Sequence, residues 1–157
     1  RICALGHSGG AALAAMLAVR DTRATDPELG EYSSRVACAV DLAGQSDVSL
    51  PSPLSGEDDA DADRLGGTPE EVPEAYRDVS PVAFVDEHSA PMLVIQGMDD
   101  IYNPVEQSRL LVAALNEAGV EVIYAELAGE DHFTIAEWER TGPLVLAFLD
   151  RQLRPAP

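Results

Sequence analysis

The chain has 157 residues, of which 46% are hydrophobic, enough for a single domain with a buried core. Its 28 acidic residues against 10 basic ones give a formal net charge of −18, and none of the basic residues is Lys. A surface this acidic repels phosphate, which argues against nucleic acid and anionic membranes as partners. No apolar run approaches the roughly 20 residues that a membrane span needs, and no signal peptide is visible.

An acidic, Lys-free composition fits either a high-salt cytoplasm or an Arg-biased genome, and the sequence does not decide between them. It also leaves compartment and oligomeric state open, with a cytoplasmic location favoured. The chain opens inside a strand and lacks an initiating Met, so we expect it to be a fragment of a longer protein.

The first ten residues predict a strand, a tight turn and the start of a helix. Ile2–Leu5 is a short apolar strand, and Gly10–Arg20 is a helix-forming run that is apolar nearly all round, so we expect a buried helix. Between them Ser8 occupies the centre of a G-x-S-x-G pattern, whose glycines allow a tight turn that exposes the hydroxyl. The N–H of Gly9, at the helix N-terminus, would face an oxyanion forming beside Ser8.

Three further strands are predicted by continuous apolar runs, at residues 35–42, 91–97 and 120–127. Continuous rather than alternating apolar character is typical of strands covered on both faces, as in a parallel sheet. Helices are expected between and after these strands, over residues 103–118, 134–140 and 143–153. The first of these begins with a capping box from Asn103 to Glu106 and ends at Gly119. Strands alternating with helices predict an α/β fold with an open, mostly parallel sheet and flanking helices.

Residues 45–90 form the irregular part of the chain and are long for a connection, so we expect a lid or a substrate-recognition insert. Glu57–Asp63 carries a run of acidic residues that we interpret as a solvated loop, because the spacing lacks the Gly and terminal Glu of an EF-hand calcium loop. Thr68–Glu71 predicts a helix start, with Thr68 as N-cap and Glu71 closing a capping box.

Cys3 and Cys38 each lie in a short apolar strand, where we expect buried free thiols rather than a disulfide or a metal site. His and Cys residues are few and scattered, so no metal site and no cofactor is expected.

Three chemistry-bearing groups follow predicted strands: Ser8 after the first, Asp99 or Asp100 after the third, and His132 after the fourth. In open parallel sheets, catalytic groups collect beyond the carboxyl ends of the strands. The order Ser, Asp, His is that of the α/β-hydrolase triad. His132 would take the Ser8 proton as Ser8 attacks an acyl carbon, while the carboxylate holds the imidazole and stabilises its charged form.

Along its whole length, the sequence resembles the C-terminal half of an α/β-hydrolase, in the esterase/lipase group that includes acetyl-esterases and feruloyl-esterase-like proteins. Gly6–Gly10 resembles the G-H-S-A-G-G elbow of this group, Gln96–Pro104 its H-G-x-x-D-x-x-V-P loop, and Gly129–Phe133 its G-x-x-H-x-F segment. Further similar segments are Val40–Gly44, Leu65–Glu70 and Ser80-Pro81. Counting three residues past Gly97 places the acid on Asp100 rather than Asp99.

The resemblance implies a serine hydrolase that cleaves small-molecule carboxylic esters through an acyl-enzyme, without a cofactor, using Ser8, Asp100 and His132. Gln96 stands where the group usually has His, and Asn103 where it has Val. A Gln-Gly pair also occurs in serine peptidases of the prolyl-oligopeptidase type, so a peptidase remains the alternative, although the elbow of those enzymes more often carries Tyr after the serine. A non-catalytic module of the same fold is a further alternative, which the intact triad argues against.

Several neighbours of the triad have expected roles. His7, beside the nucleophile, and Phe133, beside His132, pack locally or contact substrate. Asp131 is expected to hold its loop, Asp41 to make a structural hydrogen bond, and Trp138 to pack.

The family's sheet has eight strands, and the resemblance accounts only for the last four. The strand that carries Ser8 would then be a bare edge. The second oxyanion donor of the family comes from an upstream loop that this chain does not contain. Since losing one such donor costs around a hundredfold in rate, we expect the chain alone to be poorly active.

Overall fold

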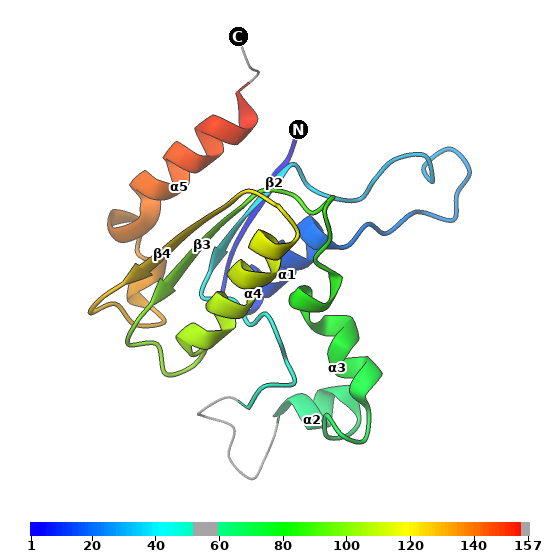
Figure 1. Ribbon diagram of the computed structural model, residues 1–157, viewed down its shortest axis with the longest axis horizontal. Coiled ribbons are helices and arrows are strands. Elements are labelled where there is room, and N and C mark those ends of the chain that lie inside the picture. Colours follow the sequence, from blue (N-terminus) through cyan, green and yellow to red (C-terminus); the bar gives the residue numbers. More distant parts are fainter. Residues whose placement is uncertain (52–59, 155–157) are drawn as a thin grey trace.

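The computed structural model describes residues 1–51 and 60–154. Four parallel strands form one sheet, as predicted, and they lie in sequence order: β1 (Cys3–His7), β2 (Cys38–Leu42), β3 (Met92–Gly97) and β4 (Val122–Leu127). The helices are α1 (Gly9–Val19), α2 (Ala60–Leu65), α3 (Pro73–Val79), α4 (Val105–Glu117) and α5 (Trp138–Leu153), with short 3-10 helices at Pro81–Phe84 and Thr134–Ala136. Helices α1 and α4 cover one face of the sheet and α5 covers the other (Figure 1).

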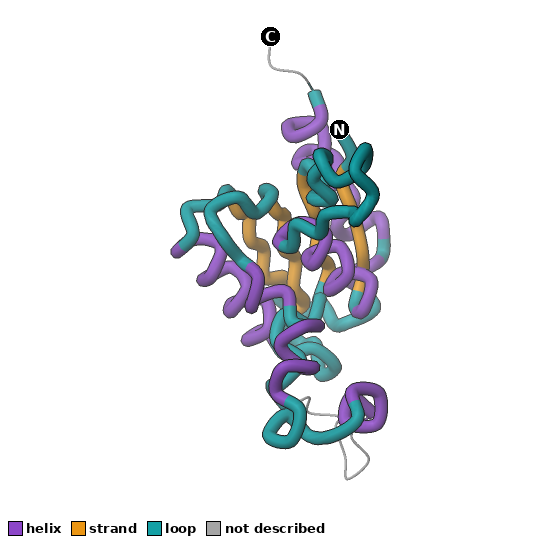
Figure 2. The backbone as a smooth tube through the Cα atoms, turned by 90° about the vertical axis from the view of Figure 1, so that its right-hand side faces the viewer, coloured by secondary structure: helices purple, strands orange, loops and turns teal. Residues whose placement is uncertain are grey.

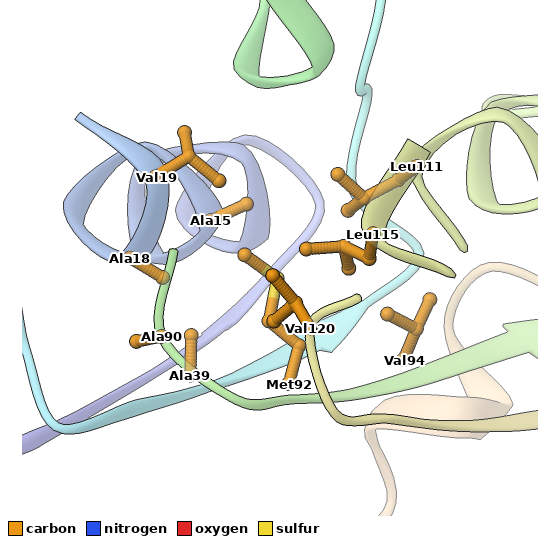
Figure 3. Packing of buried hydrophobic residues seen from close by; sticks show 10 residues of the cluster. All are labelled: Ala15, Ala18, Val19, Ala39, Ala90, Met92, Val94, Leu111, Leu115 and Val120. Carbon is orange, nitrogen blue, oxygen red and sulfur yellow. The ribbon is translucent and has the colours of Figure 1, made fainter. Parts of the chain in front are cut away.

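The core has two layers because the central strands are buried on both faces. Met92 and Val94 of β3 point toward α1 and α4, where Met92 fills the space between the two helices (Figure 3). Leu93 and Ile95, the alternate residues of the same strand, point toward α5. Each such side chain contributes about 1.5–3 kcal/mol when fully buried, which explains why these strands have continuous apolar sequences.

Helix α1 is not buried all round, contrary to the expectation from its composition. Its alanines, such as Ala11 and Ala15, are fully buried against the sheet, but Leu13 is 69% exposed and Leu17 is 47% exposed. The reason is the position of β1 at the edge of the sheet, where among the described residues no further strand lies beyond β1. The small alanine face lets the helix lie close to the strands, and the leucine face is left to solvent.

The expectation of free thiols was wrong, because Cys3 and Cys38 form a disulfide. The two residues are separated by 35 positions in the sequence but are direct partners in the parallel register of β1 and β2. Their Cα atoms are 4.6 Å apart, within the range that a disulfide can bridge. Strand pairing therefore brings together two thiols that the sequence places in separate segments.

Two predicted helix starts differ from the structure. Helix α4 begins at Val105 without a side-chain cap, because its N-cap is Pro104, which has no side-chain acceptor. Asn103 lies one residue earlier, and its amide donates to the carbonyl of Ala43, at 2.7 Å. Helix α5 begins at Trp138 and contains Pro143, which was expected to start a separate helix. The hydroxyl of Thr141 donates to the carbonyl of Ile135, at 3.0 Å, and ties the first turns of α5 to the preceding segment.

The segment after β2 contains α2 and α3, which lie apart from the sheet at the end of the molecule away from the two termini (Figure 2). The helix predicted at Thr68 is a single turn: the Glu71 carboxylate accepts the Thr68 N–H at 3.0 Å, but the next helix begins only at Pro73. Residues 52–59, with part of the predicted acidic loop, lie outside the described residues. The lid or insert function of residues 45–90 stays a prediction.

Candidate active site

Ser8 occupies the sharp turn between β1 and α1. Its backbone has φ 56° and ψ −124°, a conformation that costs energy for any residue other than glycine. A Cβ added to Gly6 would lie 1.9 Å from the carbonyl oxygen of Gly10, so the turn closes only because residue 6 is glycine. A Cβ at Gly10 itself would meet nothing within 4 Å outside the helix, so the close approach does not require glycine there.

His132 connects Ser8 to Asp100. Its Nδ1 lies 2.7 Å from Oδ2 of Asp100, and its Nε2 lies 2.9 Å from Oγ of Ser8. The carboxylate can only accept, so Nδ1–H is the donor, and Nε2 of the neutral ring is left to accept from the Ser8 hydroxyl. The side chains of His132 and Asp100 are 6% and 0% exposed. This arrangement can deprotonate a serine hydroxyl as it attacks an acyl carbon.

Backbone and side-chain donors fix the carboxylate of Asp100. Oδ1 accepts the N–H groups of Tyr102 and Asn103, both at 2.8 Å, and Oδ2 accepts Nε2 of Gln96 at 3.1 Å as well as Nδ1 of His132. Each oxygen therefore has two donors, and the carboxylate cannot rotate without losing several hydrogen bonds.

Asp99, which the strand pattern alone did not separate from Asp100, is exposed. Its backbone N–H donates to the carbonyl of Glu130, at 3.0 Å. The structure thus brings Asp100 to His132, and Asp99 ties the loop after β3 to the loop after β4.

Gln96 has a role that the sequence did not reveal. Its buried amide lies between β3 and α4, where Nε2 donates to Asp100 and to the carbonyl of Asn103, at 3.0 Å. Its Oε1 accepts the hydroxyl of Ser108, at 2.7 Å. Gln96 and Asn103 are the two departures from the resembled motif, and here both are part of the network around Asp100. The presence of both departures in one segment was the only feature of the sequence that pointed to this network.

The loop that carries His132 rests directly on the end of β3. A Cβ at Gly97 would lie 2.4 Å from the carbonyl oxygen of Glu130, so only glycine permits this contact. Asp131 caps the loop: its Oδ1 accepts the N–H groups of Phe133 and Thr134, both at 2.9 Å. These backbone donors, that of Thr134 first, lower the pKa of Asp131. The expected loop-holding role of Asp131 is confirmed.

His7 and Phe133 lie on either side of His132. Nε2 of His7 donates to the backbone carbonyl of His132 at 2.6 Å, so His7 holds the backbone of His132 in place. Phe133 is 60% exposed and makes edge contacts with the rings of Tyr102 and His132, with centroids 5.3 and 5.4 Å apart. The rings of Tyr102, His132 and Phe133, together with Ile101, line an open hollow of about 280 Å³. Whether either residue contacts substrate stays a prediction.

A second buried carboxylate, Asp41, lies in β2. Its Oδ1 accepts the backbone N–H of Gly44 at 2.7 Å, which confirms the expected structural hydrogen bond. Burial raises the pKa of Asp41 to about 6, and the Gly44 N–H offsets only part of this effect. A Cβ at Gly44 would lie 2.6 Å from the carboxylate, so glycine is required at this position.

Within residues 1–51 and 60–154, no group of three or more His, Cys, Asp or Glu side chains is placed to bind a metal ion. None of the described helices combines the length and apolarity needed to cross a membrane.

Comparison with known proteins connects this geometry to a family. Residues 1–115 match the family model described as BD-FAE. Over 152 residues the chain is 34% identical to the protein named Esterase LipC of Mycobacterium tuberculosis, a match that covers 90% of this chain and 37% of that protein. The chain therefore spans well under half the length of this relative.

Solved structures share the fold. A truncated carbohydrate esterase from gut microbiota superimposes with a TM-score of 0.79 at 22% identity, covering 96% of this chain and 59% of that one. Dipeptidyl peptidase 4 of Porphyromonas gingivalis superimposes with a TM-score of 0.74 at 17% identity, covering 94% of this chain and 19% of that one. These likenesses identify a partial α/β-hydrolase fold, and the match over residues 1–115 places the chain in the BD-FAE family.

Proposed function

We propose that this chain carries the catalytic residues of a serine hydrolase that cleaves carboxylic esters through an acyl-enzyme. Ser8 is the nucleophile, His132 the general base and then acid, and Asp100 the group that orients His132. The observation that carries the proposal is the continuous hydrogen-bond chain from Ser8 Oγ through both ring nitrogens of His132 to a buried carboxylate.

The reaction follows from this arrangement. Ser8 Oγ attacks the carbonyl carbon of the ester, and its proton moves to Nε2 of His132. The N–H of Gly9, at the N-terminus of α1, donates to the oxyanion of the tetrahedral intermediate. The bond to the alcohol oxygen then breaks, and the alcohol leaves with the proton from Nε2. Water repeats the sequence on the acyl-enzyme and restores Ser8, while Asp100 stays ionised and stabilises the imidazolium.

Ester rather than amide substrates are supported by the family and by the name of the relative from Mycobacterium tuberculosis. A peptidase of the prolyl-oligopeptidase type is the second candidate, favoured by Gln96-Gly97 and by the fold shared with a dipeptidyl peptidase. The fold alone does not separate the two, because structures of both kinds superimpose on this chain.

The test is labelling with a fluorophosphonate probe, which reacts with activated serines. We expect slow labelling, in line with the poor activity expected of the chain alone, and we expect Ser8→Ala and His132→Ala to abolish it. His88→Ala is the matched control, because His88 is exposed and pairs only with Glu87 among the ion pairs of the described residues. A folded chain that is not labelled would contradict the proposal. Turnover of p-nitrophenyl acetate against the matching p-nitroanilide then separates esterase from peptidase.

A further inference from the structure

A cavity of about 600 Å³ lies beside the nucleophile, between α1 and the two helices α2 and α3. Gly9, the residue that follows Ser8, forms part of its wall. Its volume lies within the roughly 300–1,000 Å³ of small-molecule sites. The cavity is separate from the hollow that His132 and Phe133 line, and the two share no lining residue.

The walls of this cavity are mainly apolar. From α1, the residues Ala12 and Met16 face it at helical spacing, and Val48, Leu65 and Val79 face it from the opposite side. The polar members are Gln45, Asp61, Arg64 and Asp78. Asp61 and Arg64 form an ion pair at 3.3 Å, and the remaining carboxylate, that of Asp78, disfavours an anionic group. A lining of this kind favours an uncharged, apolar group.

The direction of proton transfer decides whether the apolar group in this cavity is the acyl or the alcohol portion of the ester. In ester cleavage, the departing alcohol oxygen takes its proton from Nε2 of His132, so the alcohol portion must lie on the His132 side of Ser8. His132 lines the hollow with Tyr102 and Phe133 and does not line the apolar cavity. The acyl portion stays bonded to Ser8, and the apolar cavity, which Gly9 lines next to Ser8 and His132 does not reach, is the space that can hold it.

We propose that the cavity between α1 and α2–α3 is the acyl-binding pocket of this enzyme, and that it selects straight apolar acyl chains longer than acetyl. The proposal rests on the proposed ester hydrolysis and adds the substrate class. Ala12, Met16 and Val48 are then specificity-determining residues. Each methylene that enters the pocket strengthens binding by about fourfold, so the preference grows with chain length until the pocket is full.

The experiment measures the acylation rate of Ser8 in the full 157-residue chain with p-nitrophenyl acetate, butyrate and octanoate. We expect the rate to rise from acetate to octanoate. Ala12→Phe fills the pocket, so octanoate should lose about tenfold or more relative to acetate. Leu17→Phe is the control: it puts the same aromatic side chain at an exposed position on the same helix, outside the pocket, and should leave the profile unchanged.

A second variant protects the test against misfolding of the first. Val48→Phe fills the same pocket from a loop on the opposite wall and should give the same loss for octanoate. Acetate turnover and fluorophosphonate labelling report on the chemistry independently of chain length. If these are intact and neither variant changes the profile, the pocket assignment is wrong and the proposed function stands. If the wild-type chain shows neither labelling nor ester turnover, the proposed function has failed.

Discussion

The two central strands, β2 and β3, each place a buried aspartate near the carboxyl end of the sheet, and the two carboxylates differ in how they are held. Asp100, after β3, accepts four hydrogen bonds, two on each oxygen. Asp41, in β2, accepts one from Gly44, and burial raises its pKa to about 6. A buried carboxylate remains charged at neutral pH when enough donors surround it, and with few donors its charge destabilises the fold. A buried place near the carboxyl end of the sheet therefore does not by itself provide an aspartate with the hydrogen-bond donors that surround Asp100.

The largest expected effect separates the two aspartates in catalysis. Asp100→Asn should lower the acylation rate by about 10⁴-fold, because an amide no longer holds Nδ1–H of His132 and the wrong tautomer becomes available. Asp41→Asn should leave the rate within a few fold. Rates measured with p-nitrophenyl acetate check both variants. Equal losses in the two would mean that Asp100 acts only through the fold.

The next effect concerns how β2 is attached to β1. Removing the disulfide with the double substitution Cys3→Ala and Cys38→Ala should cost about 4 kcal/mol of unfolding free energy, because the cross-link closes a long loop in the unfolded chain. Urea unfolding measures this loss. A reducing agent should destabilise the wild-type chain by a similar amount and leave the variant unchanged, and no response of the wild type would mean that the thiols are free.

Asp41 should also make stability depend on pH. Its native pKa, about 6, lies above the ordinary 3.8, so the native state binds this proton more tightly than the unfolded state does. The contribution of Asp41 is most favourable below pH 4 and is lost as the pH rises through 6. Asp41→Asn should therefore be more stable than the wild type by about 1–3 kcal/mol at pH 8, with the difference vanishing near pH 4. A constant difference in urea unfolding at both pH values would contradict this.

The smallest expected effect tests Gln96 as a positioning residue. Gln96→Leu should cost about 1–3 kcal/mol of stability and lower the acylation rate by about tenfold, since Asp100 and Ser108 each lose a partner. Gln107→Leu is the matched control: Gln107 is an equally buried amide whose hydrogen bonds go to the backbone of Ser46 and Asp47 and to the Ser46 hydroxyl. This variant should lose stability but keep the wild-type acylation rate. The same rate loss in both variants would mean that Gln96 acts only through general stability.

The strands could be predicted from the sequence because they are continuous apolar runs, most clearly in β2 and β3, whose residues are buried on both faces. The positions of Ser8 and His132 were predictable because each follows a strand and parallel strands end at one edge, while the choice of Asp100 over Asp99 came from the resembled motif. The geometry that joins them through His132 agrees with those positions, and their catalytic roles stay a prediction.

Other features could not be predicted because they depend on partners that are distant in sequence. The exposed face of α1 follows from the edge position of β1, and the bond between Cys3 and Cys38 follows from strand register. Asn103 does not cap α4, whose N-cap is Pro104, and its amide donates to the carbonyl of Ala43 at another strand end. In each case, the tertiary arrangement, and not the local sequence, decided the outcome.

The disulfide also determines which alignments of β1 are possible. A one-residue slip of β1 along β2 would send every side chain of β1 to the opposite face of the sheet. The bond joins residues that are direct partners in the observed alignment, so such a slip would have to break it. Ser8 follows β1 directly, and the height of its hydroxyl above the sheet is set by that alignment. The covalent link at one end of the strand thus fixes the position of Ser8 at the other end.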